Sequence, residues 1–111
     1  MVGGPGASSL NFGELWHFFE RELGCPLSVL DAQQLSSADF NKYNTIILPS
    51  GNYNGLGDAA THKLDAWITA GGKLIAIEAA VGFLSGKEGF GVTQFLTDVT
   101  ANIALPYKAS Y

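Results

Sequence analysis

Residues 73–84, Lys-Leu-Ile-Ala-Ile-Glu-Ala-Ala-Val-Gly-Phe-Leu (KLIAIEAAVGFL), place one carboxylate, Glu78, inside an otherwise apolar run. The short apolar segment from Leu74 to Ile77 predicts a buried strand. The small and apolar residues from Ala79 onward predict a helix. Glu78 is therefore expected in a sharp turn between a strand and a helix.

A second strand and helix are predicted immediately upstream. Residues 45–48 (TIIL) are apolar and partly β-branched, which is typical of a strand covered on both faces. This strand ends in the turn sequence Pro-Ser-Gly-Asn-Tyr at residues 49–53. A helix is expected from about Gly57 to Ala70, where a pair of glycines closes it.

The N-terminal part predicts one more unit of this kind. Residues 1–9 are rich in glycine and are typical of a strand end that runs into a turn. A helix is expected from Leu10, with Asn11 and Glu14 spaced as in a capping box and Gly24 as the stop. Its apolar side chains recur at helical spacing on one face: Phe12, Leu15, Trp16, Phe19 and Leu23. Residues 26–30 then predict a short strand, and a short helix is expected from Ser36 or Ser37.

Strands that alternate with helices predict a parallel sheet between helical layers. The expected fold is therefore a three-layer α/β/α sandwich with a parallel, flavodoxin-like sheet, some of whose outer elements are missing. With 111 residues, the chain is expected to form a single domain over residues 1–111, a fragment of a longer protein. Residues 92–99 are compatible with a helix, and residues 102–105 with a strand or an extended tail.

The composition limits the classes of partner. The net charge is −4, and the six Lys and Arg residues form no cluster, so nucleic acids and anionic membranes are not expected partners. No apolar run approaches the roughly 20 residues that span a bilayer. Hydrophobic residues make up 47% of the chain and charged residues only 14%, which favours a large core or a surface covered by a partner.

Candidate site residues follow from the predicted topology. Ligands of parallel sheets bind beyond the carboxyl ends of the strands, so the pocket candidates are Glu78 together with Ser50, Gly51, Asn52 and Tyr53. Two roles, besides direct catalysis, are open for Glu78. Its carboxylate could accept hydrogen bonds from the first N–H groups of the following helix, or it could line a pocket and bind a ligand.

The remaining reactive side chains predict no site. Cys25 lies at a helix exit without a basic neighbour and is expected to be a buried apolar residue; as the single cysteine, it leaves the cellular compartment undetermined. His17 and His62 are expected on helix surfaces with local partners. No pair of His or Cys residues has the spacing of metal ligands, so no metal site is expected.

Residues 45–53 (TIILPSGNY) and 66–84 (AWITAGGKLIAIEAAVGFL) resemble the core of the class I glutamine amidotransferase-like fold. In that family a strand ending in Pro-Gly-Gly supplies an oxyanion loop, and a Gly-Gly-Lys turn leads into the strand before the nucleophile elbow. More narrowly, residues 8–24 (SSLNFGELWHFFERELG) with residues 48–53 (LPSGNY) are similar to the domain appended to certain bacterial zinc carboxypeptidases of the M14 type. The resemblance covers about residues 3–90.

By position, the resemblance puts Glu78 where amidotransferases have cysteine, and Gly51 in the oxyanion loop. A carboxylate cannot form the thioester of amidotransferase chemistry, and no histidine follows Glu78. The resemblance therefore implies a non-catalytic accessory or interaction domain. Its expected partner is a neighbouring domain or a second copy, and zinc is expected only in a parent peptidase, which would be secreted or periplasmic. The alternative is a small hydrolase or amidase, or a ligand sensor, using the pocket at Glu78.

Overall fold

A computed structural model describes residues 1–95, and these form a small mixed α/β domain. Its helices and strands are β1 (Val2–Gly3), α1 (Ser9–His17), β2 (Leu30–Asp31), β3 (Thr45–Leu48), α2 (Gly57–Thr69), β4 (Lys73–Ala76) and α3 (Ala79–Leu84). The chain between them adds a π-helical turn, η1 (Phe18–Glu22), and the 3-10 turns η2 (Ala32–Gln34), η3 (Phe40–Lys42) and η4 (Asn54–Leu56).

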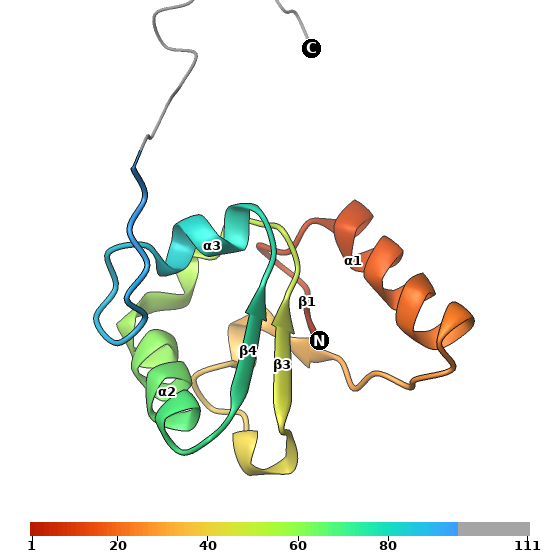
Figure 1. The fold of residues 1–111 in the computed structure, drawn as a ribbon, viewed down its shortest axis with the longest axis horizontal. Coiled ribbons are helices and arrows are strands. Elements are labelled where there is room, and N and C mark those ends of the chain that lie inside the picture. The colour runs from red at the N-terminus through yellow and green to blue at the C-terminus, as the bar shows by residue number, and fades with distance from the viewer. Residues whose placement is uncertain (96–111) are drawn as a thin grey trace, which may run out of the picture.

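The strands pair in parallel, as expected, but they form two separate two-stranded sheets instead of the single sheet that was predicted. β1 pairs with β2, with Val2 opposite Leu30, and β3 pairs with β4, with Ile46 opposite Leu74. β1 also contacts β3 (Figure 1). The loops that follow β1 and β3 bond to each other, so the carboxyl ends of these two strands meet at one edge.

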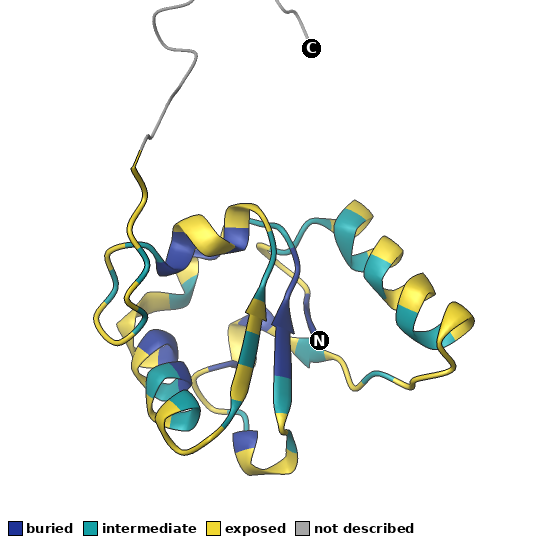
Figure 2. Ribbon diagram, viewed as in Figure 1, coloured by how far each residue is buried: buried dark blue, intermediate teal, exposed yellow. Residues whose placement is uncertain are grey.

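The core lies between β3 and the helices α2 and α3. Ile46 and Leu48 of β3 are buried against Leu64 of α2 and against Ala80 of α3 (Figure 2). The turns η2 and η3 close the same core with buried apolar side chains. Ala60 and Leu64 of α2 are buried, whereas Trp67 and Ile68 are only partly buried.

α1 contacts the other face of β1. Val2 points into the core, and successive side chains of a strand point to opposite faces, so Gly3 faces away from the core. A Cβ atom at Gly3 would come within 2.8 Å of the Phe12 ring of α1. Glycine at position 3 therefore lets the Phe12 ring lie directly on the backbone of β1.

The apolar face predicted for the first helix is not buried. No residue of α1 or η1 is buried, although Phe12, Leu15 and Phe19 are partly covered. Helical spacing shows which side chains share a face, but it carries no information on whether the domain covers that face. The helical segment, α1 continued by η1, ends at Glu22, and Gly24 just beyond it adopts the left-handed conformation expected of the stop, with a φ of 63°.

Other local predictions need correction. Ser8, and not Asn11, is the N-cap of α1, because the Ser8 side chain accepts from the Asn11 N–H at 3.4 Å. The strand expected at 26–30 is reduced to Leu30–Asp31, and 3-10 turns replace the helix expected from Ser36 or Ser37.

Two predictions fall near the end of the described chain. Residues 92–95, the described part of the helix expected at 92–99, are not helical. The rest of that prediction, and the one for residues 102–105, lie outside the described residues.

Candidate functional site

Glu78 occupies a strained turn between β4 and α3. Its φ of 49° and ψ of −115° make it the one non-glycine residue with positive φ among residues 1–95. Such a conformation costs of order 1–3 kcal/mol for a residue with a Cβ atom. The turn is held on both sides: the Ile77 N–H donates to the Leu48 carbonyl at 3.1 Å, and the Ala80 N–H donates to the Ile77 carbonyl at 3.0 Å.

The carboxylate of Glu78 does not cap the following helix. The side chain is exposed and accepts no hydrogen bond from the first N–H groups of α3. The capping role considered from the sequence is therefore wrong. The carboxylate instead lines a shallow hollow of about 370 Å³, whose other lining residues are Ala79, Val81, Gly82, Ser85, Val92, Thr93 and Gln94.

Gly51 lies where the loops after β1 and β3 cross. It forms an antiparallel bridge with Ala7. The Ser8 N–H donates to the Ser50 carbonyl at 2.7 Å, and the Asn52 N–H donates to the Gly6 carbonyl at 2.8 Å. In this pairing the N–H of Gly51 points away from Ala7. A Cβ atom at position 51 would overlap the Gly6 carbonyl, so only glycine allows this crossing.

Ser50 contributes its backbone to the loop. Its N–H donates to the side-chain oxygen of Asn11 at 2.8 Å. Asn11 is thus a residue of the site that sequence reasoning missed, because the spacing of Asn11 and Glu14 indicated a local capping box. The two side chains do interact, at 3.4 Å, but the stronger bond of Asn11 is the long-range one.

Tyr53 belongs to the core and also lines the hollows beside its loop. Only 1% of its surface is exposed, and its hydroxyl donates to the Pro49 carbonyl at 2.8 Å. The ring lies 5.9 Å from that of Phe83 in α3. Burial raises the pKa of Tyr53 to about 12, which keeps the phenol neutral. Asn52 is exposed, and its side-chain oxygen accepts from the Asn54 N–H at 3.1 Å.

The structure brings the loop at 51–54 against α3. A hollow of about 240 Å³ lies between them, lined by Gly51, Asn52, Tyr53, Asn54, Ala79, Gly82, Phe83 and Gln94. Glu78 does not line this hollow but lines the adjoining one, which shares Ala79, Gly82 and Gln94 with it. The predicted site residues are thus divided between two neighbouring hollows.

The histidines and the cysteine lie away from this edge. His17 ends α1 with its Nδ1 atom 3.4 Å from Oε1 of Glu22, and His62 is exposed on α2. Cys25 is exposed, which corrects the expectation that it is buried. Within residues 1–95, no three His, Cys, Asp or Glu side chains gather as metal ligands would.

The site therefore combines a strained turn at Glu78 and a crossed pair of glycine loops, with an exposed carboxylate at the junction of β4 and α3. None of the helices among residues 1–95 is long and apolar enough to cross a membrane.

Comparisons of the chain with models of protein families, with curated proteins and with solved structures found no match.

Proposed function

We propose that this chain is a non-catalytic accessory domain with an amidotransferase-like fold, attached to a larger protein such as an M14-type zinc carboxypeptidase. The contacts of the strands support the fold assignment. β1 pairs with β2 and β3 pairs with β4 in two separate two-stranded sheets, and β1 contacts β3. If the two pairs belong to one larger sheet, the strands follow the order 2-1-3-4, which agrees with a flavodoxin-like sheet. Phe12 on one face and the core helices on the other support a three-layer arrangement.

The observation that carries the accessory role is the exposed apolar surface of residues 9–29. No residue of this segment is buried. Leu10 is 73% exposed, Leu23 57% and Val29 56%. Exposed apolar surface of this kind marks contacts with other proteins. The proposed partner is a neighbouring domain of the same protein or a second copy of this one.

The chemistry of the elbow also favours a non-catalytic role. Glu78 cannot form a thioester, and the single cysteine, Cys25, lies in the loop after η1. His17 lies in α1 and His62 in α2, and neither histidine lines the hollow at Glu78. In this proposal no metal is held by this domain, and zinc belongs to the peptidase domain beside it.

A hydrolase, amidase or ligand sensor that uses Glu78 is the second candidate. The strained backbone favours it, since strain of this kind is concentrated at active sites and ligand clamps. The N–H of Gly51 would serve as a donor to an oxyanion in such an enzyme. Glu78 does not line the hollow beside Gly51, and this counts against it.

Two measurements test the proposal. An immunoblot of the source cells with an antibody against this domain should show a band far above 11.7 kDa, and a band near that mass would contradict the attachment to a larger protein. The purified domain should not hydrolyse glutamine, simple amides or esters. Turnover that is abolished by Glu78→Gln but kept in the exposed control Glu88→Gln would establish the second candidate instead.

A further inference from the structure

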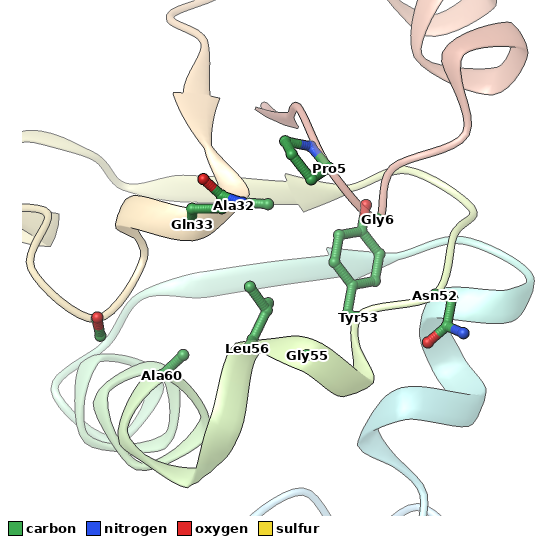
Figure 3. A pocket seen from close by; sticks show the side chains of 10 residues that line it. Pro5, Gly6, Ala32, Gln33, Asn52, Tyr53, Gly55, Leu56 and Ala60 are labelled. Atoms are coloured by element: carbon green, nitrogen blue, oxygen red, sulfur yellow. The ribbon is translucent and has the colours of Figure 1, made fainter.

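A separate cavity lies at the carboxyl ends of β1, β2 and β3. Its volume is about 290 Å³, and Glu78 does not line it (Figure 3). The loops after all three strands and the first turn of α2 contribute to it: Pro5, Gly6, Ala32, Gln33, Ser36, Asn52, Tyr53, Gly55, Leu56 and Ala60. The carboxyl edge of parallel strands is the usual place for a ligand in such folds.

The walls of this cavity carry no charged side chain. The nearby carboxylate of Asp31 accepts from the Gln33 N–H at 2.9 Å. The ammonium of Lys63 bonds to the Ser36 carbonyl at 3.1 Å and lies 5.0 Å from the centre of the Phe40 ring. A charged ligand would therefore lose water without gaining a counter-charge from the cavity walls.

The walls combine apolar surfaces with polar side chains. Ala32 and Ala60 are buried and apolar, and Figure 3 shows Pro5 and Leu56 on opposite sides of the hollow. Hydrogen-bonding groups are supplied by the amide of Gln33 and the hydroxyl of Ser36. Figure 3 shows the Asn52 side chain beyond the Tyr53 ring, and its oxygen accepts from the Asn54 N–H at 3.1 Å. A ligand that fits both the apolar surfaces and the polar groups must have apolar faces and a polar edge.

Backbone hydrogen bonds hold the cavity in shape before a ligand arrives. The Asn52 N–H donates to the Gly6 carbonyl at 2.8 Å, which joins the loops after β1 and β3. The Leu56 N–H donates to the Tyr53 carbonyl at 3.0 Å, and the Leu35 N–H donates to the Ala32 carbonyl at 3.2 Å. A preformed site loses little free energy in ordering its loops when it binds.

From this arrangement we infer that the cavity binds an uncharged heterocycle of the nucleobase class. The flat faces of the ring pack between Pro5 and Leu56, and its polar edge bonds to Gln33 and Ser36. Side-chain amides of this kind form paired hydrogen bonds with base edges. A volume of about 290 Å³ is at the lower end for small-molecule sites and suits a single base better than a dinucleotide. This inference does not depend on the accessory role or on Glu78.

Calorimetric titration with adenine, cytosine, uracil and thymine tests it, with glucose and inorganic phosphate as comparison ligands. We expect at least one base to bind and glucose and phosphate not to bind. Gly55→Phe should weaken base binding at least about tenfold, because a Cβ atom at Gly55 meets nothing within 4 Å and the ring can fill the cavity mouth. Gly13→Phe on α1, where a Cβ atom also meets nothing within 4 Å, is the matched control and should bind like the parent protein.

Two further variants complete the test. Gln33→Leu removes the amide of an exposed residue and should weaken binding without loss of folding, which a thermal melt checks. Glu78→Gln should leave base binding unchanged. This variant therefore distinguishes base binding in the cavity from any role of the turn at Glu78. The inference is overturned if no base binds at millimolar concentration. It is equally overturned if binding survives both Gly55→Phe and Gln33→Leu, or if only glucose or phosphate binds.

Discussion

The side-chain oxygen of Asn11 accepts a hydrogen bond from the backbone N–H of Ser50, a residue 39 positions further along the chain, at 2.8 Å. Asn11 lies in the first turn of α1, and Ser50 follows β3. This bond attaches the exposed helix to the loop that contains Gly51. It therefore links the proposed interaction surface to the edge of the sheet where ligands are expected.

Replacement of Asn11 by leucine should destabilise the domain by about 1–3 kcal/mol, because the Ser50 N–H loses its acceptor in a partly buried place. Asn11→Asp keeps an acceptor oxygen and serves as the control. Urea unfolding measures both. Equal midpoints for the two variants would show that this bond contributes nothing to stability.

Replacement of Glu78 by glycine should stabilise the domain. Glycine relieves a backbone strain of about 1–3 kcal/mol at a φ of 49°. The greater conformational entropy of glycine in the unfolded chain opposes this gain by about 0.5–1 kcal/mol. Glu78→Gln keeps the strain and should leave the melting temperature unchanged, since the carboxylate caps no N–H group of α3. A clear loss of stability in Glu78→Gln would restore the capping role.

Replacement of Gly51 by alanine should destabilise the domain by about 2 kcal/mol or more, because the new methyl group would overlap the Gly6 carbonyl. Gly55→Ala is the matched control, since a Cβ atom there meets nothing within 4 Å. Thermal melts of the two variants make the comparison. Similar melting temperatures would mean that the loop crossing can open at little cost.

The stability of the domain should fall between pH 10 and pH 12 because of Tyr53. Burial raises the pKa of this residue from 10.0 to about 12. In this window the unfolded chain releases the phenolic proton and the folded protein keeps it, so the free energy of unfolding decreases as the pH rises. Tyr53→Phe should remove this decrease. It should also cost about 0.5–1.5 kcal/mol at neutral pH through the lost bond to the Pro49 carbonyl. Urea titrations at several pH values measure both effects, and an unchanged pH profile in the variant would contradict the assignment.

Leucine truncation should distinguish the exposed surface from the core. Leu23→Ala should change the free energy of unfolding by less than about 0.5 kcal/mol, because the side chain is 57% exposed. Leu64→Ala in α2 should cost about 2–5 kcal/mol, because that side chain is fully buried. Equal losses in a urea titration would mean that Leu23 is covered in solution.

Much of the fold could be predicted where hydrophobic runs and glycines coincide. β3 was predicted at its observed bounds of Thr45–Leu48, and α2, β4 and the turn at Glu78 were predicted within a residue or so. In β3 and α2 the predicted and the observed burial agree, but β4 was predicted to be buried and contains no buried residue, with Ile75 40% exposed. The parallel pairing of the strands followed from their alternation with helices.

The rest could not be predicted because it depends on contacts between distant segments. Asn11 bonds to Ser50 because two loops cross, and no local spacing reveals such a crossing. Tyr53 lines pockets as predicted, but its burial beside the Phe83 ring was not evident from its place between two asparagines. The exposure of Cys25 likewise depends on what covers its loop, which composition does not show.

The bridge between Ala7 and Gly51 has a consequence for the order of events during synthesis on the ribosome. The segment after β1 cannot complete its backbone hydrogen bonds until Ser50 and Asn52 have left the exit tunnel. Until then Val2, which is completely buried in the finished domain, has no β3 to pack against. The nascent first half of the chain therefore exposes both this strand and the apolar side chains of α1, and it is the stage at which a chaperone would be needed.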